Sequence, residues 1–388
     1  MKSAFHIILA LCLCVVFASG GVARSAATTA KRAPRVKHVD EQAWRLHFPR
    51  APLPTTVRTP LLPPRTVRML FAGDVMQHLP QVTAARRADG IYDYTTSLGW
   101  MTPIFDTADL TTVNLETTLT RTSNYLGYPC FRSPVALADA LRKMGVDICV
   151  LANNHCCDGG AEGVRTTLAE LDRCGIAHTG VFADSADYRA HNPLRLERNG
   201  LRIALLNYTY GTNGIRTPQG ILVNRIDTVA MERDLRLART SETECVVVCI
   251  HWGNEYERHE NQTQRALATF LRRHGADVII GSHPHVVQPF EVDSVGVTFY
   301  SLGNFVSNQR TRYCDGGIVA DVRATWRADC PMNYVATAIP IWVQLPGYRV
   351  VPPQVADTMQ MPGWIRAAYE QFISDTRELL EVSTYKKR

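Results

Sequence analysis

Side chains of the types that bind metal ions and move protons follow five separate apolar runs in this sequence. The runs are short and rich in Val, Ile, Leu and Cys, which is typical of buried strands. Because parallel strands of an open α/β sheet place their sites at their carboxyl ends, these side chains could converge on one edge of a sheet. They are Asp74, Glu116, Asn154 with His155, His251, and His283 with His285.

Metal binding is the chemistry that this set favours. Pro284 favours extended backbone at His283, and side chains two apart on an extended chain share a face, so His283 and His285 are expected to point the same way. Oxygen and imidazole ligands without a thiolate suit Mn²⁺, Fe or Zn²⁺ better than Ca²⁺ or Mg²⁺. A carboxylate such as Glu116 could bridge two ions about 3.5–4 Å apart.

Each strand end taken alone has an ordinary structural explanation. A single histidine after a strand is more often a satisfied core or surface residue. The segment 147–160 passes from an apolar run into Asn153, Asn154 and His155 and then into Gly159 and Gly160, and Asn and Gly are common turn residues. The prediction of a site therefore rests on the repetition of one arrangement at five strand ends.

Strand and helix patterns alternate through the chain, which predicts a partly parallel α/β sheet. Late strands without helices between them indicate a mixed sheet or a second sheet. Strands are expected at 67–72, 110–115, 148–152, 245–250, 277–280, 297–302, 318–323 and 335–345, with a hairpin at 194–208 around Asn199-Gly200. Helices are expected from Ser133-Pro134 to Gly145, across Val164, Leu168 and Leu171 up to Gly175, and at 228–239, 261–274 and 364–381.

The amino-terminal part of the chain has the composition of an exported protein. Lys2, the apolar run 7–18 and the small residues Ala18-Ser19-Gly20 predict a signal peptide at 1–20, cleaved or retained as an anchor. Residues 21–66 are basic and rich in proline and predict an extended linker. Up to Arg68 there are eleven Lys and Arg and two acidic residues, a net of +9, so the total of +6 leaves −3 for the remainder.

The cysteines do not predict a zinc-binding or disulfide framework. Eleven are present, two of them in the expected signal peptide, so an odd number remains and at least one thiol is expected to be free or to pair with another chain. Cys149, Cys245 and Cys249 lie in apolar runs, where cysteine is usually a small buried hydrophobe. Cys156 and Cys157 are adjacent to His155 in sequence, but neighbouring side chains point in different directions, which disfavours a cysteine–histidine nucleophile.

Seven segments occur in a fixed order along the chain. They are Phe71-Ala-Gly-Asp-Val-Met76, Val113-Asn-Leu-Glu116, Leu151-Ala-Asn-Asn-His155 with Asp158 and Gly160, His251-Trp-Gly-Asn-Glu-Tyr256, Gly275-Ala-Asp277, Gly281-Ser-His-Pro-His-Val-Val-Gln-Pro289 and Tyr300-Ser-Leu-Gly-Asn-Phe305. As a set they resemble the bacterial CapA family of capsule and poly-γ-glutamate synthesis. Its fold is similar to that of the calcineurin-like metallophosphoesterases.

The resemblance implies a metallophosphatase-like αββα sandwich of two mixed sheets flanked by helices, at 67–345. The C-terminal part lies outside the resemblance, and a helical extension packed on the same domain is expected at 346–388. It implies that Asp74 binds a first metal, that Glu116 bridges, that Asn154 and His251 bind a second metal, and that His283 and His285 complete the pair. His155 would donate a proton to the leaving group, and a metal-bound hydroxide would be the nucleophile. Substrate contacts are expected from Asn153, Asp158, Trp252, Glu255 and Asn304.

Two positions depart from the phosphoesterase pattern. Those enzymes usually carry Asp-x-His at the first strand, whereas the nearest histidine here is His78, four residues after Asp74. They also usually carry Asp where this chain has Glu116. The longer glutamate side chain changes the spacing of the metals, and the missing histidine would weaken one metal position, so the fold is expected to carry over better than the chemistry.

These observations predict an exported protein at the periplasm or cell surface, held near the membrane if the first segment is retained. One or two ions of Mn, Fe or Zn are expected as cofactor. The predicted activity is hydrolysis of a phosphoester or related bond, with an anionic polymer similar to poly-γ-glutamate or a phosphoester as substrate and envelope synthesis or export proteins as partners. The alternative is a non-catalytic factor that binds or anchors the polymer. No segment resembles a nucleic-acid-binding module.

Overall fold

The computed structural model describes residues 62–293 and 296–385, with side chains up to Glu381. The expected signal peptide at 1–20 and most of the expected linker at 21–66 lie outside the described residues. Among the residues that are described, no helix combines the length and the apolar character needed to cross a membrane.

The first sheet has eight strands and mixes parallel with antiparallel pairs. β1, β2, β5 and β6 are parallel neighbours, whereas β16, β17 and β18 continue in antiparallel order on the other side of β1. The short β15 pairs in parallel with the carboxyl end of β1, where Asn304 lies opposite Asp74. The strands are β1 (Arg65–Val75), β2 (Leu110–Leu115), β5 (Ile148–Val150), β6 (Ala177–Thr179), β15 (Asn304–Val306), β16 (Gly316–Arg327), β17 (Cys330–Gln344) and β18 (Arg349–Val351).

The second sheet has six strands in the order β13-β14-β12-β11-β9-β8. Its four central strands are parallel, and its two edge strands are antiparallel to their neighbours. β8 and β9 form the predicted hairpin, and both Asn199 and Gly200 have positive φ, as a tight type I′ turn requires. The strands are β8 (Leu194–Arg198), β9 (Leu201–Thr209), β11 (Cys245–His251), β12 (Val278–Ser282), β13 (Phe290–Val292) and β14 (Val297–Phe299).

Two short strand pairs lie outside these sheets. β3 (Thr118–Thr120) is parallel to β4 (Arg132–Pro134), and β7 (Val181–Phe182) is antiparallel to β10 (Leu222–Val223). None of the four was predicted, because two or three residues carry no readable periodicity.

The two large sheets pack face to face, and the side chains between them form a buried apolar core. In β1, Met69 and Phe71 point into this core, while Leu70 and Ala72 point to the opposite face. Val247 of β11 is among the residues that meet them from the second sheet. A strand buried on both faces must be apolar throughout, which explains why the sequence shows continuous rather than alternating apolar runs here.

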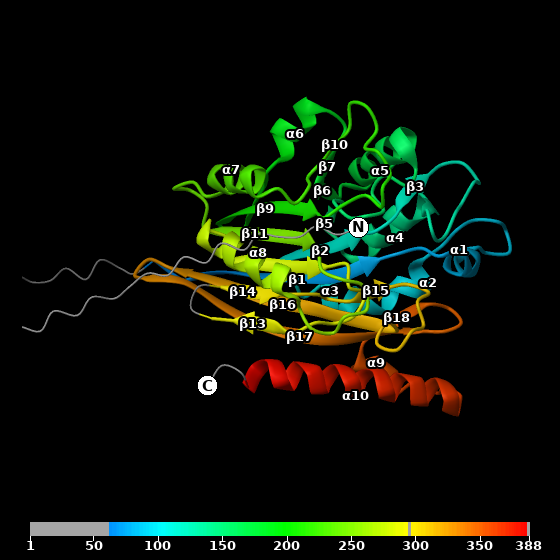
Figure 1. The fold of residues 1–388 in the computed structure, drawn as a ribbon. Helices are drawn as coiled ribbons and strands as arrows, with labels where there is room; N and C mark the ends of the chain where they lie inside the picture. The colour runs from blue at the N-terminus through cyan, green and yellow to red at the C-terminus, as the bar shows by residue number, and fades with distance from the viewer. Residues whose placement is uncertain (1–61, 294–295, 386–388) are drawn as a thin grey trace, which may run out of the picture. The chain divides into compact units, whose positions relative to one another are not determined.

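Helices cover the outer face of each sheet, so the layers follow the order helix, sheet, sheet, helix (Figure 1). The first sheet is covered by α2 to α5 and the second by α7 and α8. This confirms the predicted αββα sandwich of two mixed sheets. The helices are α1 (Leu79–Ala85), α2 (Thr95–Leu98), the 3-10 turn η2 (Gly99–Met101), α3 (Thr102–Phe105), α4 (Ala136–Met144), α5 (Gly160–Cys174), α6 (Ser185–His191), α7 (Thr228–Ala238), α8 (Gln262–Arg273), α9 (Pro353–Ala356) and α10 (Gly363–Tyr385).

The start of α4 differs from its prediction. Ser133 and Pro134, expected as N-cap and first-turn proline, belong instead to β4, and the helix begins at Ala136. The Ser133 hydroxyl lies 2.7 Å from the Thr117 hydroxyl, so it is engaged in a tertiary contact rather than capping the helix. Gly145 ends the helix with φ of +103°, as predicted.

Residues 346–385 add the strand β18 and the helices α9 and α10 to the fold. β18 pairs with β17, so the first sheet continues beyond residue 345. α10 runs alongside β17 (Figure 1). Its Tyr369 and Phe372 pack with Trp342 in a separate apolar cluster, so this part of the chain supports the edge of the first sheet.

Candidate metal centre

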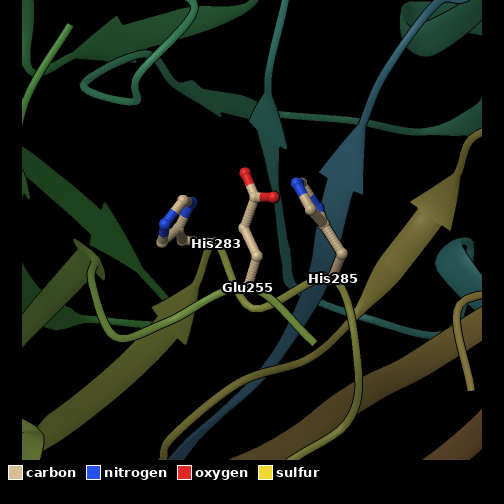
Figure 2. Close-up of side chains that lie close together, drawn as sticks. All are labelled: Glu255, His283 and His285. Carbon is tan, nitrogen blue, oxygen red and sulfur yellow. The ribbon is translucent and has the colours of Figure 1, made fainter. Parts of the chain in front are cut away.

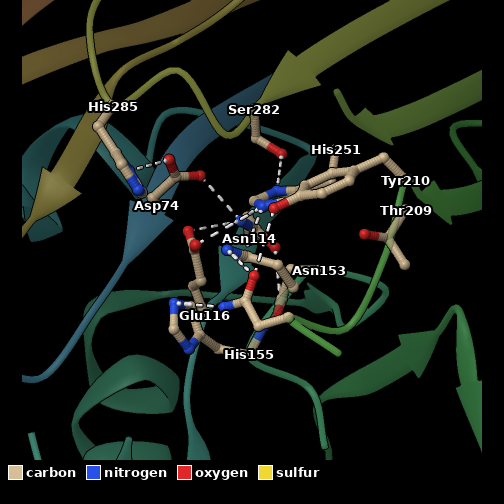
Figure 3. A network of polar contacts seen from close by, with 12 residues as sticks. Asp74, Asn114, Glu116, Asn153, His155, Thr209, Tyr210, His251, Ser282 and His285 are labelled. Carbon is tan, nitrogen blue, oxygen red and sulfur yellow. Dashed lines mark hydrogen bonds and ion pairs between the residues drawn. The ribbon is translucent and has the colours of Figure 1, made fainter. Parts of the chain in front are cut away.

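The predicted strand ends of both sheets meet in one buried cluster. Asp74 lies near the end of β1, and Glu116 directly follows β2 in the first sheet. His251 ends β11, and His283 and His285 follow β12 in the second sheet. All five are almost completely buried. Figure 3 shows how Asp74, Glu116, His251 and His285 converge from the carboxyl ends of parallel strands, where an open sheet leaves room for a site.

Two carboxylates form one half of the cluster. Asn114 donates its side-chain amide to Asp74 Oδ1 at 2.8 Å and to Glu116 Oε2 at 3.3 Å, and His285 Nδ1 lies 3.0 Å from Asp74 Oδ2. Glu116 Oε1 has no hydrogen-bond partner among the described residues. Burial, and then the negative charge of Asp74, raise the pKa of Glu116 well above its usual value. A buried pair of this kind calls for a compensating positive charge.

Imidazoles form the other half. His251 lies between Ser282 Oγ, 2.9 Å from its Nδ1, and Asn154 Oδ1, 2.9 Å from its Nε2. Burial lowers the pKa of His251 and lowers that of His283 to about 3. The Tyr210 ring lies 4.5 Å from the His283 ring between centroids. Both histidines are therefore neutral at physiological pH, the form in which imidazole binds a metal.

The backbone that presents His283 and His285 is not the extended one that was predicted. Their φ angles are +99° and +59°, in a region that residues other than glycine seldom adopt. The two rings nevertheless approach to 6.0 Å between centroids. Positive φ at two successive histidine positions is a strained arrangement of the kind found at functional sites, held here by the surrounding contacts.

A turn after β5 places His155 beside the carboxylates. His155 Nδ1 donates to Asp158 Oδ2 at 2.7 Å, and the same oxygen accepts the Phe131 N–H at 2.6 Å. The Phe131 ring packs edge-on against the imidazole, 4.6 Å away between centroids. Asn213 donates its side-chain amide to His155 Nε2 at 3.4 Å. The ring is thus fixed, with Nε2 on the side away from Asp158.

Asn153 and Asp158, expected as substrate contacts, are placed where they hold this turn together. Asn153 donates to the Leu115 carbonyl at 2.8 Å and to Asn114 Oδ1 at 3.1 Å, and it accepts the His155 N–H. Asp158 binds His155 and Phe131 through Oδ2, whereas its buried Oδ1 has no hydrogen-bond partner among the described residues. Both residues therefore orient neighbours of the cluster.

The other three expected substrate contacts lie in different environments. Trp252 is buried in the core between the second sheet and its helices, where its indole donates to the Tyr300 carbonyl. Asn304 is buried and donates to the His285 and Cys314 carbonyls. Only Glu255 is exposed, and its carboxylate lies close to His283 and His285.

His78 does not occupy the place of the missing first-strand histidine. Met76, two residues after Asp74, is a buried core side chain. His78 lies at the start of α1, where its Nδ1 accepts the Asn308 N–H at 3.2 Å and its ring packs edge-on against Phe131. Burial lowers the pKa of His78 to about 4. Its contacts are those of a structural histidine.

Three residues of the site were missed from the sequence. Asn114 stands two residues before Glu116 and shares its face of β2, so period-two alternation could have indicated it. Tyr210 follows the apolar run of β9, and Ser282 ends β12, so both obey the strand-end rule applied elsewhere. They were passed over because tyrosine and serine are weaker metal-site signals than histidine or carboxylate.

The cysteines take no visible part in the cluster. Cys130, Cys149, Cys156, Cys157, Cys174, Cys245, Cys249, Cys314 and Cys330 are all free in the described part of the chain. Cys156 and Cys157 are buried, with sulfur atoms 3.8 Å apart. The hydrogen bond with the Cys157 thiol, and then burial, raise the pKa of Cys156, which does not favour Cys156 as a thiolate nucleophile.

The donor set fits a divalent transition metal. Two groups of potential ligands each have their donor atoms within 4.8 Å of one another: Asp74, Glu116 and His285, and Glu255, His283 and His285. Glu116 Oε1 and His283 Nδ1 are buried atoms without hydrogen-bond partners among the described residues, although Glu116 Oε1 lies 3.6 Å from His251 Nε2. A cation would satisfy carboxylate and imidazole atoms that lack hydrogen bonds in a buried cluster.

Comparison with known proteins identifies the family. The family model described as bacterial capsule synthesis protein PGA_cap matches residues 68–309, more than half of the chain. The chain therefore belongs to this family of bacterial capsule synthesis proteins, in agreement with the ordered segments of the sequence.

Several curated proteins are similar to this chain. The PGA biosynthesis protein CapA of Bacillus subtilis is 32% identical over 264 residues, which cover 64% of this chain and 66% of that protein. The capsule biosynthesis protein CapA of Bacillus anthracis is 34% identical over 191 residues, covering 46% and 45%. A probable polyglutamine synthesis accessory protein of Mycobacterium tuberculosis is 26% identical over 216 residues, covering 52% and 56%. The matches thus span between about half and two-thirds of these relatives.

Among solved structures, the 5'-nucleotidase from Candida albicans aligns with 69% of this chain and 50% of its own chain. The TM-score is 0.38 and the sequence identity is 13%.

Proposed function

We propose that this chain is a metal-dependent hydrolase that cleaves a phosphoester or related bond during the synthesis or processing of an anionic cell-surface polymer such as poly-γ-glutamate. One observation carries the proposal: carboxylates and imidazoles from the strand ends of both sheets converge in a buried cluster beside an oriented histidine. The polymer class is taken from the family and from the names of the relatives.

A bound Mn²⁺, Fe or Zn²⁺ ion would polarise an oxygen of the substrate and lower the pKa of water. The chain would hold one or two such ions in a fixed geometry, with its imidazole ligands neutral and its carboxylate ligands anionic. The residues that would hold them are Asp74, Glu116, Asn154, His251, His283 and His285.

His155 would move the proton. With Nδ1 donating to Asp158, Nε2 is the ring atom that would serve a leaving-group oxygen, in place of the Asn213 amide that it accepts at 3.4 Å. Phe131 covers one side of the ring and limits the orientations that the imidazole can adopt. A positioned general acid of this type typically contributes about 10²–10⁴-fold to a rate.

The first experiment is elemental mass spectrometry of the purified chain beside Glu116→Ala and His283→Ala. We expect one or two equivalents of a transition metal in the parent and a loss in both variants, because each removes a buried ligand. Turnover of a chromogenic phosphodiester and of a glutamyl polymer is then measured on the metal-loaded parent. A parent without metal after refolding with Mn²⁺ or Zn²⁺ would contradict the proposal, and metal without turnover would leave a polymer-binding factor.

We also propose that the protein is exported and acts at the periplasm or cell surface. Lys2, the apolar run 7–18 and the basic, proline-rich stretch that follows support this. Export is tested by fractionating cells that express the full chain and by sequencing the amino terminus of the mature protein. A chain recovered in the cytoplasm with its first residues intact would contradict it.

A further inference from the structure

We propose that Glu255 is a metal ligand, which with His283 and His285 forms a cation position next to the one formed by Asp74, Glu116 and His285. The inference rests on the proposed function in one respect, since both require a metal centre. It assigns Glu255 a role different from the substrate contact expected from the sequence.

The first support is geometric. The carboxylate of Glu255 and the ring nitrogens of His283 and His285 lie within 4.8 Å of one another, and Figure 2 shows the carboxylate between the two imidazoles. Two histidines and one glutamate are a ligand set that transition metals accept while an open position remains for water or substrate. Because His285 also belongs to the group with Asp74 and Glu116, the two positions are neighbours.

The second support is an unpaired buried atom. His283 is only 4% exposed, and its Nδ1 has no hydrogen-bond partner among the described residues. A buried ring nitrogen is normally paired, so one without a hydrogen bond, on a ring beside a carboxylate and a second imidazole, indicates a missing ligand. Tyr210 packs against the same ring and restricts how far it can turn to find another partner.

The third support is the way the Glu255 loop is fixed to the turn that carries the histidines. The Tyr256 N–H, next in sequence, donates to the Pro284 carbonyl at 2.8 Å. The buried Gln288 side chain donates to the Glu257 carbonyl at 2.8 Å and to the His259 carbonyl at 3.2 Å. Glu255 therefore directly precedes an anchored stretch of the loop, which lowers the entropy lost when its carboxylate binds an ion.

Exposure gives Glu255 a distinct place in the centre. Asp74, Glu116, His283 and His285 are buried, whereas Glu255 is exposed. The buried ligands would bind the ion from the protein interior, and Glu255 would bind it from the solvent side. Loss of Glu255 should accordingly weaken one cation position and leave the fold and the other position intact.

The test is isothermal titration calorimetry of the full, metal-stripped chain with Mn²⁺ and with Zn²⁺, with bound metal counted by elemental mass spectrometry. Glu255→Gln keeps the shape and removes the charge. Glu257→Gln is the matched control, since Glu257 is an exposed glutamate of the same loop whose carboxylate accepts from the Asn254 side chain and belongs to neither ligand group.

We expect two equivalents in the parent and in Glu257→Gln. In Glu255→Gln we expect one equivalent to be lost or weakened by at least about 100-fold, with an unchanged melting temperature of the metal-free protein. Glu116→Gln should affect the other equivalent, and the double variant should bind neither. If the parent binds two ions and Glu255→Gln binds two at parental affinity, the assignment of Glu255 is wrong while the metal centre stands. If the parent binds none, both proposals fail.

Discussion

His155 is oriented by two residues: Phe131, which is distant in sequence, and Asp158, which follows three residues later. Asp158 fixes Nδ1 and Phe131 packs on the ring, so Nδ1 is committed, and Nε2 would do the chemistry by exchanging its 3.4 Å contact with the Asn213 amide for a leaving group. We expect His155→Ala to keep its metal and to lose about 10²–10⁴-fold in kcat on a phosphodiester, because only proton transfer is removed. Asp158→Asn should lose about 10–100-fold, because the orienting charge is lost and the shape is kept. Unchanged turnover in His155→Ala would remove it from the mechanism.

The buried carboxylate of Glu116, which we propose binds metal, should destabilise the metal-free fold. Its pKa in the folded protein is raised above the unfolded value of 4.5, by burial and then by Asp74. The stability that such a group contributes is fully present below pH 4.5 and is lost as the pH rises, because ionisation is easier in the unfolded chain. The metal-free Glu116→Gln variant should therefore be more stable than the parent at pH 7, by about 1 kcal/mol or more.

This difference between Glu116→Gln and the parent is measured by urea unfolding with a chelator present, at pH 7 and at pH 4.5. It should shrink at the lower pH, where the parent carboxyl is protonated. His251 and His283 have lowered pKa values, so their contribution is full above pH 6.5 and is lost as the pH falls. That loss is common to both proteins and cancels in the difference. A variant less stable than the metal-free parent at pH 7 would show that Glu116 is not the destabilising charge.

Among the elements, β1 and β15 approach each other so closely that residue 73 must be glycine. A Cβ at this position would overlap the carbonyl oxygen of Gly303 and lie 3.2 Å from the Leu302 side chain. The same contact positions Asp74, whose N–H donates to the Gly303 carbonyl at 3.1 Å. We expect Gly73→Ala to cost about 1–3 kcal/mol of unfolding free energy and to weaken metal binding. Gly99→Ala, with no atom within 4 Å of the new Cβ, should change neither.

The strand ends could be predicted from the sequence because each apolar run stops where its ligand begins, as at Ile250 and His251. The backbone after β12 could not, because the positive φ values of His283 and His285 are imposed by tertiary contacts and oppose the local preference before proline. β15 could not be predicted from the sequence either. It is three residues long, and only its pairing with β1 beside Asp74 gives it a structure.

At the scale of the whole molecule, the site joins two sheets whose facing sides pack through an apolar core. Asp74 and Glu116 come from the first sheet, whereas His251, His283 and His285 come from the second. The resemblance to a family predicts that these residues lie at one centre. Their hydrogen bonds could be identified only from the packed sheets of the structure. Residues such as Asn114, which contact ligands from both sheets, follow only from that packing.

Because its ligands come from both sheets, a bound metal should stabilise the entire fold rather than one loop. A ligand that binds only the folded state adds RT ln(1 + [L]/Kd), about 2.7 kcal/mol at a hundredfold excess over Kd and about 1.4 kcal/mol for each further tenfold. We expect the melting temperature to rise with the logarithm of the Mn²⁺ or Zn²⁺ concentration and amide exchange to slow in β1 and β11 alike. His283→Ala should flatten this dependence, whereas Phe372→Ala, in the cluster around α10, should lower the melting temperature at every concentration and keep the slope. Slower exchange in β11 alone would show that the metal is held by the second sheet without the carboxylates of the first.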